Sequence, residues 1–328
     1  MSGSGQDWRP SASQQRLRQR AALLARTREF FAARGVLEVD TPVLVNAPVS
    51  DLHLHCARVQ LDGSASPLFL HTSPEYAMKR LLAAGSGDIY QICHVVRGLE
   101  SGALHNPEFT LIEWYRLGVP LRFLMDEVEA LVRVLLAEAP TARAAERLSY
   151  REAFERELGI DPLAASDAAL AAAVRALGYR APASAAGDAA RDESLELLMG
   201  TKVGPRLGRQ ALTFVHSYPA SQAALARLDP ADARVAERFE LYCEGVELAN
   251  GFRELTCERE QRARFERDNA ERRRRGLPVA PPDEWLLAAL AAGLPDCAGV
   301  ALGFDRTLML ASGAQRIEDV LSFPTARA

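Results

Sequence analysis

Polar and charged side chains are concentrated in residues 96–115, VRGLESGALHNPEFTLIEWY. A loop of Gly and Ser separates a leading Arg from a run rich in β-branched and aromatic residues, which predicts two strands joined by the loop. Alternation along the second strand places Phe109, Leu111, Glu113 and Tyr115 on one face. Burying a carboxylate on such a face is costly unless it has a partner, and a cationic ligand would be one such partner.

Three other segments combine polar residues with strand or turn patterns. Residues 72–80 read TSPEYAMKR, residues 245–255 read GVELANGFREL and residues 299–306 read GVALGFDR. The first leads from a short strand into a helix, whose dipole would favour Glu75 in the first turn whatever its function. The last is a Gly-bearing strand that passes into a helix, and a helix N-terminus at such a turn, with Arg306 beside it, is suited to an anion.

Together these segments resemble the catalytic domain of class II aminoacyl-tRNA synthetases of the lysyl type. Arg97 with HNPEF and EWY is similar to motif 2, residues 72–80 are similar to the amino-acid-binding TSPE element, and residues 299–306 are similar to motif 3. Residues 245–255 narrow the resemblance to the elongation factor P lysine ligases, a family of truncated lysyl-tRNA synthetase paralogues. The resemblance covers nearly the whole chain.

The resemblance implies an α+β fold, in which an antiparallel sheet is flanked by helices. Residues 1–328 are expected to form a single class II synthetase-like catalytic domain, with an Ala-rich helical insertion at about residues 139–200. Residues 12–34 have the spacing of an amphipathic helix, and residues 36–42 resemble motif 1, which implies a homodimer. About a dozen mostly polar residues precede that helix, so no anticodon-binding domain is expected, and tRNA is not expected as a partner.

Composition and charge limit the classes of function. The chain has 328 residues, of which 48% are hydrophobic and 25% charged, as is ordinary for a globular protein. A formal net charge of −4 provides no global basic field of the kind that nucleic-acid binding usually needs. The five cysteines form no CxxC pair and are expected to be free thiols in a reducing cytoplasm. Neither a membrane span nor a signal peptide is expected from the apolar runs.

The resemblance implies adenylation of an amino acid by ATP, followed by acyl transfer. Negative charge gathers on phosphoryl oxygens, so the site must supply fixed positive charge and a metal ion. Arg97 would hold the α-phosphate and the substrate carboxylate, Arg306 would hold the γ-phosphate, and Phe109 and Arg306 would sandwich the adenine. Related enzymes have Glu where this chain has Leu99, and Glu100 is expected to take over the adenine amino group. The residues assigned to ATP are Arg97, Glu100, His105, Phe109, Glu247, Leu248, Gly303 and Arg306.

The same resemblance assigns an amino-acid site. Glu75 would take the amine nearer the carboxylate, and Glu254 with Tyr115 would take the terminal amine. Two acidic sites for two amines explain the choice of a diamino acid, because an unpaired carboxylate in a closed site is costly. Ala301 stands where lysyl-tRNA synthetases usually have Gly, which fits a non-standard lysine isomer. The donor would be (R)-β-lysine or lysine, and the acceptor a lysine side chain of elongation factor P. The residues assigned to the amino acid are Ser73, Glu75, Tyr115, Asn250, Glu254 and Ala301.

Two carboxylates, Glu240 and Glu247, match metal-binding positions of the lysyl family. Hard oxygen ligands suit Mg²⁺, which binds through one or two carboxylates together with substrate phosphates. The residues alone favour the alternative, a pair of edge-strand carboxylates in water. Residues 259–275 are highly charged, and the mixture of Arg with Glu and Asp favours a salt-bridged, solvated helix over nucleic-acid binding.

Three alternatives remain open. A minimal lysyl-tRNA synthetase-like enzyme with a separate tRNA-binding subunit is disfavoured by the acidic net charge. A catalytically inactive regulatory paralogue would fit the departures at Val96 and Leu99. The residues that argue against it, because all are retained, are Arg97, Glu247, Glu254 and Arg306. An amide-forming synthetase of the asparagine type is disfavoured by the two amine-binding acids.

Overall fold

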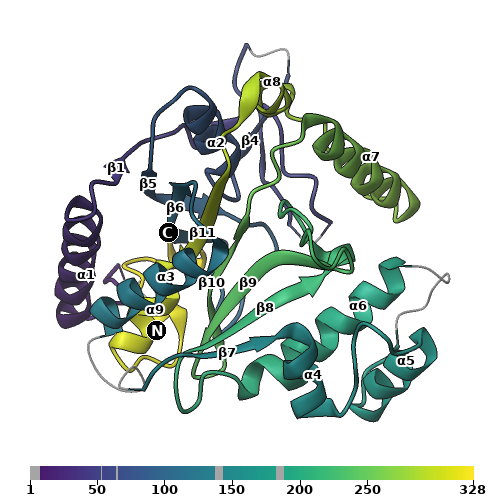
Figure 1. Ribbon diagram of the computed structural model, residues 1–328. Helices are drawn as coiled ribbons and strands as arrows, with labels where there is room; N and C mark the ends of the chain where they lie inside the picture. Colours follow the sequence, from purple (N-terminus) through teal and green to yellow (C-terminus); the bar gives the residue numbers. More distant parts are fainter. Residues whose placement is uncertain (1–7, 53, 64–65, 137–142, 182–187) are drawn as a thin grey trace, which may run out of the picture.

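The computed structural model describes residues 8–52, 54–63, 66–136, 143–181 and 188–328 (Figure 1). Within these residues the main sheet has eight strands in the order β1-β5-β6-β11-β10-β9-β8-β7. The pairs from β5 to β8 are antiparallel, and the pairs at the two edges, β1 with β5 and β7 with β8, are parallel. The expected antiparallel sheet flanked by helices is confirmed, with a parallel strand added at each edge. The strands are β1 (Leu37–Glu38), β5 (Ile89–Val96), β6 (Glu108–Leu117), β7 (Glu146–Ser149), β8 (Thr213–Pro219), β9 (Val235–Cys243), β10 (Val246–Arg253) and β11 (Cys297–Gly303).

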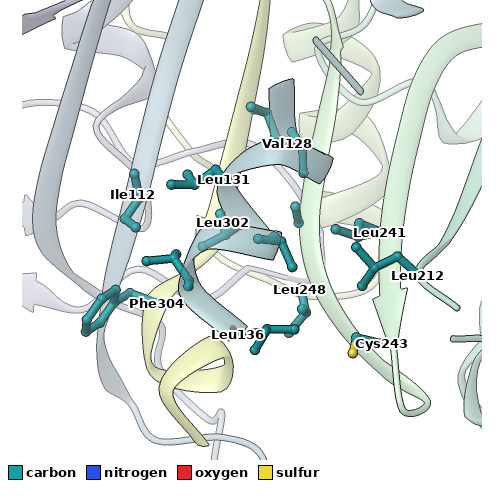
Figure 2. Packing of buried hydrophobic residues seen from close by; sticks show 14 of the residues in the cluster. Ile112, Val128, Leu131, Leu136, Leu212, Leu241, Cys243, Leu248, Leu302 and Phe304 are labelled. Carbon is teal, nitrogen blue, oxygen red and sulfur yellow. The ribbon is translucent and has the colours of Figure 1, made fainter. Parts of the chain in front are cut away.

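One face of the sheet is covered by α1 (Gln14–Ala32), α3 (Leu121–Leu136) and α9 (Phe304–Ala311), whose buried side chains join those of the strands in the largest hydrophobic cluster. Apolar residues recur along α3 at helical spacing, so one stripe of the helix faces the sheet. Figure 2 shows Val128 and Leu131 of this stripe among the buried side chains of the strands. Each such side chain contributes about 1.5–3 kcal/mol on full burial, and this cluster fixes the sheet that carries the site.

The first helix lies where the sequence predicts it. The expected segment 12–34 forms α1, and Ser13 caps its N-terminus by accepting a hydrogen bond from the backbone N–H of Arg16. Gly35, with a φ of 66°, follows the helix in the left-handed conformation that glycine adopts without strain.

The other face carries a second group of helices, and its buried apolar residues form a separate cluster with the ends of β5, β6 and β11. The charged segment 259–275 forms most of α7, and its ion pairs one turn apart, such as Arg262 with Glu258, agree with the salt-bridged interpretation. A three-stranded sheet of order β2-β4-β3 lies outside the main sheet. These elements are α2 (Glu75–Ala83), α7 (Glu258–Arg274), α8 (Glu284–Gly293), β2 (Leu44–Val45), β3 (Arg58–Val59) and β4 (Leu68–Leu70).

The described part of the Ala-rich segment at about 139–200 includes three α-helices that pack on the β7–β8 end of the sheet around a separate hydrophobic cluster (Figure 1). It also supplies the edge strand β7, which its composition did not predict. Residues 139–142 and 182–187 of this segment lie outside the described residues. None of the described helices is both long enough and apolar enough to cross a membrane. The remaining helices are α4 (Tyr150–Leu158), α5 (Asp167–Ala176), α6 (Asp188–Leu198), η1 (Met199–Val203), η2 (Gly204–Arg206), η3 (Ala220–Gln222), η4 (Ile317–Asp319) and η5 (Thr325–Arg327).

Candidate active site

A cavity of about 900 Å³ lies over the face of the sheet that α3 does not cover. The alternation predicted along β6 is confirmed, because Leu111, Glu113 and Tyr115 line the cavity while Ile112 and Trp114 belong to the core beneath α3. With the exception of Glu240, the residues predicted to bind a ligand all line this cavity: Ser73, Glu75, Arg97, Glu100, His105, Phe109, Tyr115, Glu247, Leu248, Asn250, Glu254, Ala301, Gly303 and Arg306.

Glu113 is a buried carboxylate on the cavity face of β6. Its oxygens accept hydrogen bonds of 2.7 Å from Ser73 Oγ and 2.7 Å from Tyr115 Oη. Burial and the nearby Glu75 carboxylate raise the pKa of Glu113 to about 7, although both hydrogen bonds oppose the shift. Its partners are therefore hydroxyl groups of the protein, and Glu113 positions two side chains that were assigned to the amino acid.

Lys79 was not assigned a role from the sequence, yet it lies between two residues that were. Its Nζ is 2.6 Å from Glu75 Oε1, one helical turn away on α2, and 2.6 Å from Glu254 Oε2 at the end of β10. Burial disfavours its charge, but the Glu254 and Glu75 carboxylates outweigh burial and raise the pKa of Lys79 above its usual value. The signal in the sequence was the spacing of four residues from Glu75, which places both side chains on one face of a helix.

Gly299 on β11 lies against the side chains of Tyr115 and Glu254. It pairs with Tyr115 across the sheet, and a Cβ at this position would be 2.3 Å from Tyr115 Cε1 and 2.5 Å from Glu254 Oε1. Real Cβ atoms essentially never approach other atoms this closely, so a glycine is required for these two side chains to occupy their positions.

Arg97 is held at the end of β5 by contacts with neighbouring loops. Its Nε donates a 3.2 Å hydrogen bond to the backbone oxygen of Thr72. Its guanidinium carbon lies 5.2 Å from the centre of the Phe109 ring, within the range of a cation–π contact. Arg97 is thus oriented over the ring that was assigned to adenine.

Leu99 and Glu100 follow Arg97 in the loop. Leu99 has a φ of 69° and is 82% exposed, in a left-handed conformation that is uncommon for a residue other than glycine. The turn directs the Leu99 side chain into solvent, while Glu100 lines the cavity and approaches Arg97 Nη1 to 3.9 Å. Of these two neighbouring residues, it is Glu100 that presents an acidic side chain to the cavity near Arg97.

Arg306 is fixed by three acceptors. It donates to the backbone oxygen of Glu247 at 3.0 Å, to the backbone oxygen of Leu104 at 3.3 Å and to Nε2 of His105 at 2.7 Å. Burial and the neighbouring Arg306 lower the pKa of His105, so the imidazole is neutral at pH 7 and can accept this hydrogen bond. Both arginines thus lie in the cavity with their side chains already oriented.

Glu240 lies beneath the cavity rather than in its lining. It accepts hydrogen bonds of 2.6 Å from Arg238 Nη2 and 2.6 Å from Tyr242 Oη. Arg238, which sequence reasoning missed, does line the cavity and donates to Asn250 Oδ1 at 3.2 Å. Glu240 therefore orients a cavity arginine, and through it the assigned residue Asn250.

Glu247 is the other carboxylate proposed to bind metal, and it faces the cavity. Burial and the nearby Glu240 carboxylate both raise the pKa of Glu247. The Glu247 side chain is nevertheless 40% exposed, so we attribute the raised pKa mainly to the charge of Glu240. Within the described residues there is no group of three or more His, Cys, Asp or Glu side chains that could hold a metal ion by themselves.

The cavity combines two arginines, one at the end of β5 and one in the first turn of α9, with a set of carboxylates in its lining. The arginines suit phosphate and carboxylate oxygens, and the Glu75 and Glu254 carboxylates suit ammonium groups. The arrangement is therefore suited to a nucleotide together with an amino acid that carries more than one amine.

Comparisons with known proteins identify the family of the chain. The chain matches the family model of class II tRNA synthetases (D, K and N) over residues 5–327. It is 50% identical over 322 residues to an elongation factor P--(R)-beta-lysine ligase of Vibrio parahaemolyticus, covering 97% of this chain and 98% of that protein. Proteins of the same name from Vibrio cholerae (50% over 326 residues, 98% and 99% covered) and Erwinia tasmaniensis (51% over 324 residues, 98% of each) are similar to it in the same way. The chain therefore belongs to the class II tRNA synthetase family that includes the D, K and N enzymes.

Proposed function

We propose that this chain is an ATP-dependent ligase that adenylates (R)-β-lysine or lysine and transfers it to a lysine side chain of elongation factor P. The observation that carries the proposal is a single cavity in which two carboxylates for amines, Glu75 and Glu254, share the lining with Arg97 and Arg306. The names of the relatives support (R)-β-lysine as the donor and elongation factor P as the acceptor.

In the adenylation step, a carboxylate oxygen of the amino acid attacks the α-phosphorus of ATP, and pyrophosphate leaves with the electron pair of the broken P–O bond. Arg97 would hold the α-phosphate and the attacking carboxylate, and Arg306 would hold the γ-phosphate. Because backbone carbonyl groups already orient both guanidinium groups, little reorganisation is needed as charge develops. Neutral His105 would keep Arg306 in place without adding charge.

In the transfer step, the amine of the acceptor lysine attacks the carbonyl carbon of the adenylate. An amide bond forms, AMP leaves with the electron pair of the mixed anhydride, and the attacking nitrogen loses a proton to water. The adenylate is already activated, so no nucleophile from the chain is required. The chain's part in this step is to hold the aminoacyl group by its two ammonium groups, at Glu75 and at Glu254 with Tyr115.

We propose Mg²⁺ as the metal that accompanies ATP. Glu247 fits this ion, since its carboxylate faces the cavity beside Arg306, and Glu240 lies close enough to affect the Glu247 pKa. One or two carboxylates with substrate phosphates are the usual Mg²⁺ ligands. When bound, Mg²⁺ would neutralise phosphate charge. Glu240 accepts one hydrogen bond on each oxygen, from Arg238 and from Tyr242, and would join the ion through a remaining lone pair.

We further propose that the protein is a homodimer and acts in the cytoplasm, as expected of an enzyme that modifies a translation factor. The short edge strand β1 has no neighbour on its outer side in the described sheet, and its Leu37 is 54% exposed. An unprotected edge with an exposed apolar residue supports a partner chain there. The net charge of −4 supports a protein acceptor over tRNA.

The proposed function is tested by the intact mass of elongation factor P after incubation with this protein, MgATP and (R)-β-lysine. We expect a mass gain of one lysyl group, and no gain when Arg306→Ala replaces the unmodified chain, because phosphate binding is lost. Lysine tRNA is assayed in parallel. Charged tRNA with an unmodified factor would establish the minimal synthetase instead, and no change in either would support the inactive paralogue.

A further inference from the structure

Lys79 is a buried cation at the amino-acid end of the cavity. It is one of two lysines in a chain that has 39 lysines and arginines, and its side chain is 2% exposed. Among the described residues its polar contacts are the Glu75 and Glu254 carboxylates, both at 2.6 Å. An ammonium carries three donors on one atom and can bridge two carboxylates, whereas the planar guanidinium that this chain uses almost everywhere else is bulkier.

We propose that Lys79 is a positioning residue for amino-acid binding: its ammonium holds the Glu75 and Glu254 carboxylates side by side and favours the charged form of Glu254, so that each carboxylate can receive one ammonium group of a diamino acid. This inference rests on the proposed ligase function and deepens it, since it names the group that sets the charge of the pocket.

The charges in the pocket agree with two incoming ammonium groups. Glu75, Glu113 and Glu254 interact with one another, and Lys79 is the cation among them. When all four groups are charged, three carboxylates and one ammonium leave two negative charges, which the two ammonium groups of a diamino acid would neutralise. Among the described residues, four other titratable groups near this cluster are neutral, because burial raises their pKa values: Tyr76 from α2, Cys93 from β5, Tyr115 from β6 and Cys297 from β11.

Within the described part of the chain, one carboxylate oxygen of Glu254 has no hydrogen-bond donor, while the other forms an ion pair with Lys79. Its Oε1 is buried and accepts no hydrogen bond from the residues that the structure describes. A buried acceptor without a partner is destabilising, so this oxygen favours a ligand that donates to it. Lys79 engages the other oxygen, Oε2, and so leaves Oε1 available for the substrate.

The ionisation of these groups gives the proposal a pH signature. Burial raises the pKa of Glu254 to about 8 and that of Glu113 to about 7, and Lys79 lowers both. Before an amino acid binds, both groups therefore already bind protons in part at pH 7, and without Lys79 the two pKa values rise further, so that a larger fraction of each is protonated. A diammonium ligand must then displace those protons, which weakens binding about tenfold for each unit by which the pKa exceeds the pH. Raising the pH removes the protons and restores binding.

The test compares the unmodified chain with Lys79→Met, whose side chain has a similar length and no charge. Amino-acid-dependent exchange of pyrophosphate into ATP is measured with (R)-β-lysine and with lysine from about pH 6.5 to about pH 9. For Lys79→Met we expect the KM for the amino acid to rise about tenfold at pH 7 and to approach the unmodified value near pH 9. The kcat should change little, because Lys79 does not contact the reacting atoms. The matched control, Lys202→Met, should leave both unchanged at every pH.

A second variant separates this role from a merely structural one. Adding Glu113→Gln to Lys79→Met removes one of the neighbouring negative charges that raise the Glu254 pKa, while the amide oxygen can still accept from Tyr115. We expect the KM at pH 7 to return toward the unmodified value. A loss of kcat in Lys79→Met that is equal at every pH and is not restored by Glu113→Gln would overturn the proposal.

Failure of the proposed function would look different. In that case the unmodified chain would support exchange with neither amino acid, and calorimetric titration of both proteins with (R)-β-lysine would decide the role of Lys79. A weaker affinity in Lys79→Met that recovers with rising pH supports it, and equal affinity or no binding to either protein refutes it.

Discussion

At single positions in the pocket, the neighbouring side chains limit the size of the side chain that fits. Gly299 lies directly against Tyr115 and Glu254, and the absence of a side chain there allows both to reach the cavity. Its conformation is not the reason for the glycine, since no positive φ is recorded at this position. The close approach of two side chains is the reason, and a family motif that contains this glycine therefore has a local physical cause.

We predict that Gly299→Ala lowers the free energy of unfolding by about 1–3 kcal/mol, the usual range for an overpacked core, and raises the KM for the amino acid more than the KM for ATP. The methyl group would displace Tyr115 and Glu254, while Arg97 and Arg306 are not in contact with it. Urea denaturation and pyrophosphate exchange measure the two effects. Gly303→Ala on the same strand is the control for stability, because its Cβ would meet no atom closer than 3.7 Å. Equal losses of stability in the two variants would contradict the prediction.

At the scale of elements, the buried carboxylate of Asp305 connects α9, β6 and α1 next to residues assigned to ATP. Asp305, at the start of α9, accepts a 2.7 Å hydrogen bond from the backbone N–H of Thr110 on β6 and forms an ion pair with Arg20 of α1. Arg20 also donates to Thr110 Oγ1 at 2.6 Å. The position of Arg306, the next residue after Asp305, therefore depends on this connection between the helices and the sheet.

We predict that Asp305→Ala destabilises the protein by about 3 kcal/mol, because it removes the only carboxylate paired with the partly buried Arg20 among the described residues and leaves the Thr110 N–H without an acceptor. The KM for ATP should rise as well, since the start of α9, which carries Arg306, loses its polar connection to β6 and α1. Chemical denaturation compares this variant with Asp319→Ala. That change removes a 3.9 Å ion pair with Arg16 of α1, in which the Asp319 side chain is 39% exposed and the Arg16 side chain 28%. That exposed pair should contribute less than about 1 kcal/mol. A similar loss in both variants would show that the Asp305 connection is not what anchors α9.

At the scale of the whole molecule, the sheet ends at β1, a two-residue strand whose Leu37 is exposed. Val43, just before β2, is also exposed at 42%. Natural sheets rarely leave an edge of this kind uncovered, which is the structural support for the proposed homodimer.

We predict that light scattering of the full chain gives twice the mass of one chain, and that Leu37→Glu combined with Val43→Glu shifts it to the mass of a monomer. Charged side chains would be buried at the interface without partners, which is costly. Val279→Glu, at an apolar residue that is 45% exposed elsewhere on the surface, should leave the mass unchanged. A monomeric unmodified chain would refute the proposal directly.

Local patterns in the sequence determined much of the framework and the composition of the site. Alternation placed Leu111, Glu113 and Tyr115 on the cavity face of β6, and capping with helical spacing placed α1 within two residues of its observed ends. Such patterns depend on neighbours along the chain, so they are readable without the fold. The motifs, in their order, pointed to the family before any contact was known.

Only the tertiary structure decided which charges meet. Lys79 lies between Glu75 and Glu254 because α2 packs beside the end of β10, and no local pattern links these segments. Glu240 faces Arg238 and Tyr242 instead of lining the cavity, and β7 joins the sheet through a parallel pair with β8. Ion pairs between distant segments follow from the order of strands in the sheet, and that order is set by how the whole core packs rather than by any single stretch of sequence.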